Sequence, residues 1–330
     1  MKQSEFLQDL DAFLQEWHND EPTVWVHTSG STGMPKPLQV EKERMKASAR
    51  LTCQFLGLKE KDTALLCMPL QYIAGKMVVV RSLVAGLKLI PIAPCGHPLK
   101  NLKEAPTFAA MIPMQVYNSL QIPEEKCILK NIKYLIIGGG AIDSSLAKEL
   151  KDFPNQVWST YGMTETLSHI ALRRLNGDKA SDWYTPFDSV RICLSEEGTL
   201  IIHAPNICQE ELRTNDIAEI NDEGKFRILG RKDNTINSGG IKIQIEQVES
   251  LLKEHLSIPI QITSAPDFKF GEIVVLLYNK VYDEAEIKSI CEEKLPPYWI
   301  PKKYMPVDEL PLTGTGKPDR ATARKIARGE

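Results

Sequence analysis

Hydrophobic residues along the first two thirds of the chain follow two alternating patterns. Short, continuous apolar runs indicate buried strands, whereas apolar residues three and four positions apart indicate helices with one buried face. The apolar run from Lys76 to Leu87 fits either a buried helix or a strand. Strands that alternate with helices predict an α/β sheet covered by helices. The expected strands are 24–26, 63–68, 108–112 and 134–137, and the expected helices are 6–17 and 144–150.

The pattern changes after residue 190. Between Val190 and Ile228, short β segments are separated by Glu-Gly and Asp-Glu-Gly turns, which predicts a small antiparallel sheet or barrel. We therefore predict a large N-terminal α/β domain with an accessory antiparallel β subdomain, residues 1–230, and a small α+β C-terminal lid domain, residues 231–330. In the lid, helices are expected at 243–252 and 284–295, strands at 258–265 and 273–278, and weak structure in the proline-rich stretch after Leu295.

Composition narrows the functional classes. The 330 residues carry a net charge of −3, which gives no electrostatic basis for binding nucleic acid or an anionic membrane. No apolar run approaches the roughly 18 residues of a membrane span. The seven cysteines include no C-x-x-C pair and the six histidines lack ligand spacing. We therefore expect reduced thiols in a cytoplasmic protein, without a structural zinc site.

A segment rich in hydroxyls and glycine follows the first expected strand. It consists of Thr28, Ser29, Gly30, Ser31, Thr32, Gly33, Met34, Pro35 and Lys36. Hydroxyls and backbone N–H groups can surround a phosphate where glycines permit close approach, and Lys36 adds a positive charge. The spacing differs from that of a Walker loop, and a flexible surface loop is the alternative interpretation.

Two further motifs follow expected strands. The first is Gly138, Gly139, Gly140 and Ala141, and the second is Tyr161, Gly162, Met163, Thr164, Glu165 and Thr166. Backbone without side chains can line a flat ligand at the glycines, although a tight turn is the alternative. In the second motif, Tyr161 can stack on a base and Glu165 can hold Mg²⁺, unless the segment is only the capped start of a helix.

Polar positions in the last third have both ordinary and functional explanations. Asp216, which we expect before a strand, can bind ribose hydroxyls or belong to a turn. Arg231 can reach ribose or phosphate, although a surface salt bridge is commoner. Gly239 and Gly240 are typical of a turn or of a close passage of ligand along the backbone. Lys317 lies in a glycine loop, where most lysines are solvated.

In this order, the motifs resemble those of the adenylate-forming superfamily, which includes acyl-CoA synthetases, luciferases and peptide-synthetase adenylation domains. The resemblance runs from about Thr28 to Arg320. It implies a ligase that acts in two steps. A carboxylate attacks the α-phosphate of ATP with release of pyrophosphate, and a thiol, usually that of CoA, then displaces AMP from the acyl adenylate.

The resemblance also implies roles for individual residues. The segment 28–36 would hold the β- and γ-phosphates, Glu165 would hold Mg²⁺, and Lys317 would bridge the attacking carboxylate and the α-phosphate. Asp233 matches the hinge about which the lid would rotate, so that Lys317 leaves and the segment at Gly239 and Gly240 forms the CoA channel. The expected catalytic residues are Lys317, Glu165 and Lys36, and the other expected ATP or AMP contacts are Gly139, Gly140, Ala141, Tyr161, Gly162, Met163, Thr164, Asp216 and Arg231, with Gly139 also beside the acyl substrate.

The segment 68–77 departs from the superfamily, because Tyr72 stands where a histidine is common. Its sequence and the short chain resemble the compact o-succinylbenzoate–CoA ligases of bacterial menaquinone biosynthesis. That acid carries a second carboxylate, which needs a cation or several donors if it is buried. Lys76 and Arg81 are the candidate cations and Tyr72 offers a ring and a hydroxyl; the alternative places both cations on a helix surface.

Other functions remain open at this level. One alternative is another aryl- or acyl-CoA ligase, or a stand-alone adenylation enzyme that loads a carrier protein. A second is a regulator that binds nucleotide or an acyl ligand without catalysis, although Lys36, Glu165 and Lys317 argue against it because a binder has no chemical need for a mobile lysine. Since only 27 residues precede Thr28, a homodimer that covers an exposed face is a further hypothesis.

Overall fold

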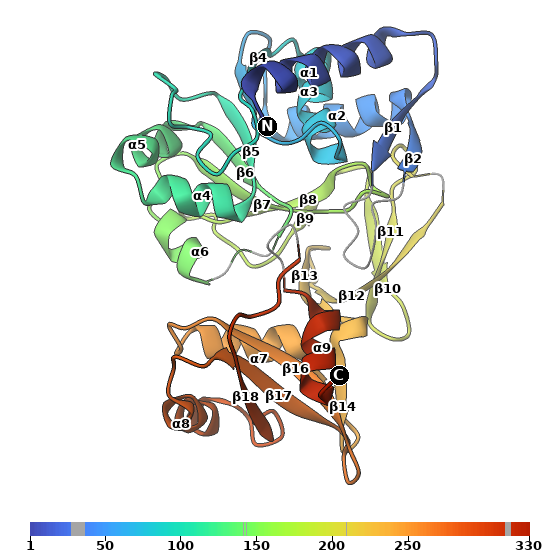
Figure 1. Ribbon diagram of the computed structural model, residues 1–330. Helices are drawn as coiled ribbons and strands as arrows, with labels where there is room; N and C mark the ends of the chain where they lie inside the picture. Colours follow the sequence, from blue (N-terminus) through green and yellow to red (C-terminus); the bar gives the residue numbers. More distant parts are fainter. Residues whose placement is uncertain (28–36, 141, 143, 209, 314–317) are drawn as a thin grey trace. The chain divides into compact units, whose positions relative to one another are not determined.

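The computed structural model describes residues 1–27, 37–140, 142, 144–208, 210–313 and 318–330 (Figure 1). These residues form two compact units. The first comprises residues 1–193, 201–212 and 220–226, and the second comprises 194–200, 213–219 and 227–330. The domain boundary near Asp233 stays a prediction. Within the described residues, none of the helices has the length and apolar character that a membrane crossing requires.

The first unit begins with an amphipathic helix, α1 (Gln3–His18). Its buried face carries Phe6, Leu10, Phe13 and Trp17, as the helical spacing predicts. Strand β1 (Thr23–His27) follows and pairs antiparallel with β2 (Pro37–Glu41). The predicted N-terminal helix and first strand are thus confirmed. Thr28, Ser29, Gly30, Ser31, Thr32, Gly33 and Lys36 lie outside the described residues.

A seven-stranded sheet forms the centre of the first unit, in the order β4-β3-β5-β6-β7-β8-β9. The pairs from β4 to β7 are parallel, whereas β8 and β9 join antiparallel. Parallel strands are buried on both faces, which explains why they appear as continuous apolar runs. The strands are β3 (Thr63–Leu66), β4 (Lys88–Pro91), β5 (Phe108–Met111), β6 (Tyr134–Ile137), β7 (Gln156–Gly162), β8 (His169–Arg174) and β9 (Thr185–Pro186).

Helices cover both faces of this sheet, with α1 to α3 on one side and α4 to α6 on the other (Figure 1). The apolar run at 76–87 lies mainly in a helix, α3, whose residues are buried on nearly all sides. The core beneath α4 to α6 packs Val116, Leu129 and Leu150 with residues of β3, β5, β6 and β7. The helices are α2 (Lys42–Leu56), α3 (Ile73–Ala85), α4 (Pro113–Leu120), α5 (Pro123–Asn131) and α6 (Ser144–Leu150).

The accessory sheet is also confirmed: four strands pair in sequence order and contribute residues to both units. They are β10 (Arg191–Leu194), β11 (Thr199–His203), β12 (Leu212–Ile220) and β13 (Phe226–Arg231). Asp216 lies inside β12, so its expected position before a strand is wrong, as is the turn alternative. Most residues of β12 are half-buried or exposed. Such a strand tolerates polar residues, so its sequence lacks the apolar pattern from which a strand is predicted.

The second unit contains a five-stranded sheet, in which β15-β14-β17-β16 follow one another and β18 pairs parallel with β17. Helices α7 and α8 pack on one core, which includes Ile236, Leu276 and Cys291. The elements are the 3₁₀ turn η1 (Lys232–Asn234), β14 (Thr235–Ser238), β15 (Ile241–Gln244), α7 (Ile245–Lys253), β16 (Ile260–Asp267), β17 (Gly271–Asn279), α8 (Glu284–Lys294), β18 (Lys303–Val307) and α9 (Arg320–Arg328).

Two expectations for this unit are wrong. The stretch after Leu295 is not weakly structured, because it contains β18 and α9. Pro306 fits in β18 because that strand pairs only with β17 among the described strands, and an edge strand tolerates a residue without N–H. The helix expected from residue 243 begins at Ile245, because residues 241–244 pair with β14 across a hairpin.

A buried ion pair joins α7 to the start of α9. Glu249 is only 6% exposed. Its two carboxylate oxygens accept hydrogen bonds from Nη1 and Nη2 of Arg320 at 2.5 and 2.7 Å, and Oε1 also accepts from the backbone N–H of Ile262 at 2.8 Å. Removing either partner of such a pair leaves the other charge buried without compensation.

We expect Arg320→Met to weaken this part of the second unit by about 3 kcal/mol, since Glu249 would stay buried and unpaired. Native-state hydrogen exchange of the Ile262 amide would report the loss as faster exchange. Lys280→Met is the matched control, because the Lys280–Asp308 pair is exposed. Equal protection of Ile262 in both variants would contradict the prediction.

Candidate functional site

The predicted motifs of the first unit meet at one edge of its central sheet. Because β3, β5, β6 and β7 are parallel, their carboxyl ends lie at the same edge, where α/β proteins commonly bind ligands. Gly138 follows β6 and approaches β7 so closely that an added Cβ would lie 2.3 Å from Oγ1 of Thr160. The motif at Gly139 and Gly140 therefore lies beside the motif that begins at Tyr161. Ala141 lies outside the described residues.

Tyr161 is half-buried and belongs to an aromatic cluster. Its ring centroid lies 5.9 Å from that of Tyr184 and 5.0 Å from that of Phe226. Those two rings stack on each other at 5.4 Å, and Ser159 Oγ lies 2.9 Å from the Tyr184 hydroxyl. The packing fixes the plane of Tyr161, which is what a platform for stacking on a base requires.

The segment after Tyr161 is a tight turn, so the alternative of a capped helix start is wrong. Oγ1 of Thr166 accepts a hydrogen bond from the Met163 N–H at 2.9 Å, and the same hydroxyl oxygen lies 2.7 Å from the backbone oxygen of Ser168. A Cβ on Gly162 would lie 2.3 Å from that same backbone oxygen, so only glycine fits at the bulge between β7 and β8. Thr164 is buried in this turn, and Glu165 projects from it.

Glu165 is exposed, and the turn holds its backbone. Sγ of Cys208 donates a hydrogen bond to the backbone oxygen of Glu165 at 3.2 Å, which leaves the carboxylate out of this contact. In the part of the chain that the structure describes, no group of three or more His, Cys, Asp or Glu side chains is arranged to hold a metal ion. A single carboxylate nevertheless suits Mg²⁺, which often takes one or two protein ligands together with phosphate and water.

Helix α3 carries the candidate residues of the acid site. Tyr72 is the residue before the helix, and its backbone bridges to His27 at the end of β1. Lys76 and Arg81 are five positions apart, which places them about 140° apart around the helix axis. Both are buried, at 8% and 2% exposure, so the alternative of helix-surface charges is wrong for both.

Lys76 faces α1 and β1. Its Nζ lies 3.3 Å from Oε2 of Glu16 and donates to the backbone oxygen of Trp25 at 2.5 Å. The same ammonium lies 4.8 Å from the centroid of the Phe13 ring. These contacts use the charge of Lys76 to hold the N-terminal helix on the unit.

Arg81 faces the turn between β7 and β8. Its Nη2 donates a hydrogen bond to Oγ of Ser168, whereas its Nε–H has no hydrogen-bond partner among the described residues. Burial lowers the pKa of Arg81 to about 10, so the side chain stays positive at neutral pH. A buried guanidinium with an unpaired N–H is costly unless an anion binds to it. We therefore attach the carboxylate-binding hypothesis to Arg81.

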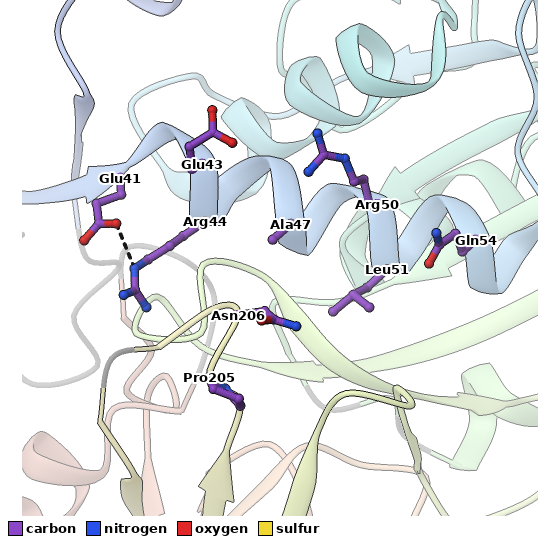
Figure 2. A pocket seen from close by; sticks show the side chains of 9 residues that line it. All are labelled: Glu41, Glu43, Arg44, Ala47, Arg50, Leu51, Gln54, Pro205 and Asn206. Atoms are coloured by element: carbon purple, nitrogen blue, oxygen red, sulfur yellow. Dashed lines mark hydrogen bonds and ion pairs between the residues drawn. The ribbon is translucent and has the colours of Figure 1, made fainter.

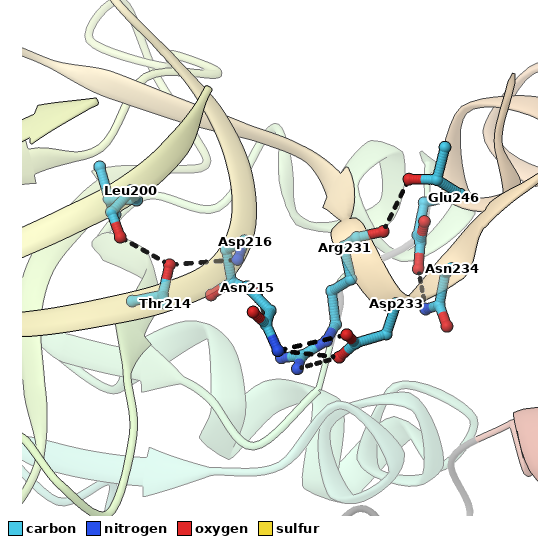
Figure 3. Close-up of polar contacts among 9 residues, drawn as sticks. Leu200, Thr214, Asn215, Asp216, Arg231, Asp233, Asn234 and Glu246 are labelled. Atoms are coloured by element: carbon cyan, nitrogen blue, oxygen red, sulfur yellow. Dashed lines mark hydrogen bonds and ion pairs between the residues drawn. The ribbon is translucent and has the colours of Figure 1, made fainter. Parts of the chain in front are cut away.

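In the second unit, Asp216, Arg231 and Asp233 lie together (Figure 3). Nη1 of Arg231 lies 3.2 Å from Asp216 and Nη2 lies 3.0 Å from Asp233. Asn215 donates to both oxygens of Asp233 at 3.2 Å. Thr214 accepts the Asp216 N–H at 3.1 Å, which positions the backbone of that residue. Arg231 thus links Asp216, the other expected ribose ligand, to the expected hinge residue Asp233.

The expected CoA contacts of the second unit, Gly239 and Gly240, lie on a turn. Gly239 and Gly240 connect β14 and β15 with φ angles of +58° and +84°, which suit a two-residue hairpin and confirm the expected turn. Lys317 lies outside the described residues. Leu312 and Pro318, which are described, form a β-bridge.

A groove of about 520 Å³ lies along α2 in the first unit (Figure 2). The predicted site residues do not line it, and in it Arg44 pairs with Glu41 at 3.0 Å. The lining residues are Glu41, Glu43, Arg44, Ala47, Arg50, Leu51, Gln54, Pro205 and Asn206.

The sequence did not single out three residues that connect to Arg81: Ser168 contacts it directly, His169 contacts Ser168, and Thr52 contacts His169. His169 is buried, with Nε2 3.0 Å from Oγ1 of Thr52 and Nδ1 3.2 Å from Oγ of Ser168. The available signal was the pair Ser168-His169, which places polar residues two positions after the Thr-Glu-Thr motif and at the start of a buried strand.

Comparison with known proteins identifies the family. Residues 2–205 match the model of the AMP-binding enzyme family, and residues 262–317 match that of the AMP-binding enzyme C-terminal domain. The chain belongs to the AMP-binding enzyme family. The resemblance to adenylate-forming enzymes and the expected fold of a large α/β region with a small C-terminal domain are therefore confirmed.

Individual relatives carry more specific names. A 2-succinylbenzoate–CoA ligase of Bacillus subtilis (strain 168) is 26% identical over 364 residues, covering 100% of this chain and 74% of the relative. An acyl-CoA synthetase (AMP-forming)/AMP-acid ligase II-like protein of Dyadobacter fermentans, a solved structure, is 31% identical with a TM-score of 0.67 and covers 96% of this chain and 93% of its own. The o-succinylbenzoate CoA synthetase (MenE) of Bacillus subtilis, solved with the acyl-adenylate OSB-AMP, is 25% identical with a TM-score of 0.77, covering 93% and 69%.

The burial of His169 predicts a pH dependence of stability. Burial, and then the charge of Arg81, lower the pKa of His169 well below its ordinary value of 6.5. Below that pH the unfolded chain takes up a proton that the native state does not, so stability falls as pH falls, by at most about 1.4 kcal/mol per pH unit. Between pH 7.5 and 5.5, the melting temperature of the wild type should therefore fall more than that of His169→Asn.

Thermal denaturation at three pH values in this range measures the difference. His255→Asn provides the matched control, because His255 is exposed. Parallel pH curves for the wild type and His169→Asn would show that the imidazole is protonated equally in the native and unfolded states.

Proposed function

We propose that this protein is an ATP-dependent carboxylate–CoA ligase that converts o-succinylbenzoate (2-succinylbenzoate) to its CoA thioester, a reaction of menaquinone biosynthesis. Membership of the AMP-binding family supports the chemistry, and the names of the relatives support the acid. The observation that carries the choice of acid is Arg81, a buried cation with an unpaired N–H beside the Tyr161 turn. A monocarboxylic acid would leave that charge without a partner once its one carboxylate is activated.

The first half-reaction forms the acyl adenylate. An oxygen of the carboxylate attacks the α-phosphate of ATP, and pyrophosphate leaves. Tyr161 stacks on adenine, and the backbone at Gly139 and Gly140 flanks the base and the acid. Asp216 accepts hydrogen bonds from ribose, with Arg231 alongside. When Mg²⁺ is bound, it neutralises phosphate charge, and Glu165 is the residue that would hold it.

The lysines supply positive charge where negative charge accumulates. Lys36, within the segment Thr28–Lys36, binds the β- and γ-phosphates, and Lys317 donates to the α-phosphate and the attacking carboxylate. In the second half-reaction the CoA sulfur attacks the acyl carbonyl and AMP leaves. We propose that rotation at Asp233 then replaces Lys317 with the hairpin at Gly239 and Gly240.

The second carboxylate of the acid binds Arg81. A carboxylate can accept hydrogen bonds from two guanidinium N–H groups, and such charge-assisted pairs are strong where water is excluded. Lys76 does not take this role, because Glu16 and the Trp25 carbonyl already bind its ammonium. Tyr72 precedes the same helix and contributes the wall nearest β1.

Two further points belong to the proposal. The seven cysteines are all free, which fits a reducing compartment such as the cytoplasm. A homodimer stays a hypothesis, and light scattering of the purified protein tests it.

The decisive experiment mixes the protein with o-succinylbenzoate, ATP and Mg²⁺, and measures release of pyrophosphate. Adding CoA should then yield AMP and a thioester that mass spectrometry detects. Pyrophosphate release without a thioester would point to a carrier-loading enzyme. No pyrophosphate release with any of a panel of aryl and acyl acids would point to a non-catalytic binder.

Lys317→Ala should abolish adenylate formation, because the positive charge at the α-phosphate is lost. It should largely spare the conversion of preformed acyl adenylate and CoA into thioester. Single-turnover assays of each half-reaction measure the two effects. An equal loss in both half-reactions would contradict an alternation between two lid positions.

Arg81→Met should raise the KM for o-succinylbenzoate about 100-fold, because a charge-assisted pair in a buried site is lost. Two monocarboxylate analogues, each lacking one of the carboxylates, identify which group is activated, and turnover of the reactive analogue should change little. Lys76→Met is the matched control: it loosens α1 and lowers the melting temperature without changing the preference between the acids. A larger loss of this preference in Lys76→Met than in Arg81→Met would return the role to Lys76.

A further inference from the structure

A chain of buried polar groups runs from α2 through β8 to α3, and the proposed reaction does not use most of it. Oγ1 of Thr52 lies 3.0 Å from Nε2 of His169, whose Nδ1 lies 3.2 Å from Oγ of Ser168. Ser168 Oγ also accepts a hydrogen bond from Nη2 of Arg81. Thr52 and His169 are buried, at 0% and 6% exposure, so water does not substitute for these contacts.

The position of each proton is assigned from these contacts. The Thr52 hydroxyl donates to the backbone oxygen of Ser48 at 3.4 Å, so its oxygen is free to accept the Nε2–H of His169. A neutral imidazole has one donor and one acceptor, and Nδ1 must therefore accept from the Ser168 hydroxyl. The remaining lone pair of Ser168 then faces Arg81. This tautomer is assigned from the network because it gives each donor one acceptor.

The surroundings keep the imidazole neutral. Burial disfavours its charged form, and the charge of Arg81, which faces it from α3, also opposes a second cation nearby, so the pKa of His169 is lowered. From α2, Cys53 packs beside Arg81 and donates through Sγ to its backbone oxygen at 4.0 Å. On the remaining side, the Phe187 ring lies 5.6 Å from the imidazole centroid. A protonated ring would present Nδ1–H to Ser168 and remove the acceptor for the serine hydroxyl.

We infer that His169 is a positioning residue that sets the acid preference of the enzyme. Its Nδ1 orients the Ser168 hydroxyl so that the serine oxygen accepts from Arg81. This contact uses one guanidinium N–H and aims the others, including the unpaired Nε–H, at the second carboxylate of the acid. The inference rests on the proposed function, because it explains how Arg81 is held ready for that carboxylate.

A merely structural role for the same contacts makes a different prediction. If His169 only ties α2 to β8, its loss lowers stability and affects all substrates alike. If it orients Ser168, its loss affects the acid that needs Arg81 and spares ATP and the reactive monocarboxylate analogue. The two roles therefore separate by comparing KM values within one variant.

The test uses four variants of the full chain. His169→Phe keeps a ring but removes both nitrogens, whereas His169→Asn places an amide oxygen near the position of Nδ1. We expect His169→Phe to raise the KM for o-succinylbenzoate about tenfold, with the other two KM values changed less than about twofold. His169→Asn should recover most of this loss.

Phe187→Leu is the matched control, because it disturbs packing on the imidazole without removing a hydrogen bond. Ser168→Ala removes the hydroxyl itself and should reproduce the His169→Phe result, which keeps the test decisive if His169→Phe does not fold.

Three outcomes would overturn the inference: equal KM changes for both acids in His169→Phe, no recovery in His169→Asn, or a loss of preference in Phe187→Leu as large as that in His169→Phe. Arg81→Met separates this failure from that of the proposed function. If Arg81→Met changes the acid preference and His169→Phe and Ser168→Ala do not, the inference alone fails. If Arg81→Met leaves the preference unchanged, the proposed binding of the acid fails with it.

Discussion

Burying a charge in an apolar interior costs several kcal/mol unless opposite charge or hydrogen bonds compensate it. This constraint organises both units of the protein. In the second unit, Glu249 and Arg320 satisfy each other through two parallel hydrogen bonds. In the first unit, Lys76 meets Glu16 and a backbone carbonyl. Arg81 differs from these two pairs, because it is 2% exposed and its Nε–H has no partner among the described residues. An incompletely satisfied buried cation is a natural receptor for an anionic group.

The constraint also explains why a histidine lies next to this cation. A neutral imidazole can donate on one side and accept on the other without adding charge. His169 thereby joins a threonine of α2 to a serine of the β7–β8 turn, and its pKa is lowered by burial and then by the charge of Arg81. A glutamate in its place would neutralise Arg81 and remove its attraction for a carboxylate.

Backbone geometry provides the frame for these side chains. The parallel strands bring Gly138 against Thr160 at one edge of the sheet, and the bulge at Gly162 turns the chain back toward β8. The hydroxyl of Thr166 closes this turn with contacts to the backbone of Met163 and Ser168. One short segment thus carries Tyr161, Glu165, Ser168 and His169. Under the proposed function, the contacts to nucleotide and to acid would come from this one segment.

The sequence by itself determined the periodic elements and the order of the family motifs. Helix α1, strand β6 and helix α6 follow from local periodicity. A helix with one buried face has apolar residues three and four positions apart, and a strand buried on both faces is a continuous apolar run. The motifs at Gly139 and Tyr161 follow from local chemistry in the same way. Each of these inferences needs only residues that are close in sequence.

Tertiary structure decided what depends on distant partners. An apolar run such as 76–87 looks the same in a buried helix and a buried strand, and packing against α2 and β3 selects the helix. Pairing at the sheet edge allows Pro306 to lie in strand β18. Strand β12 is half-exposed and therefore polar in sequence, so the position of Asp216 inside it could not be predicted. Lys76 and Arg81 have different contacts, and their partners, Glu16 and Ser168, lie 60 and 87 residues away in the sequence. Local composition does not specify such pairings, because they exist only after the chain has folded.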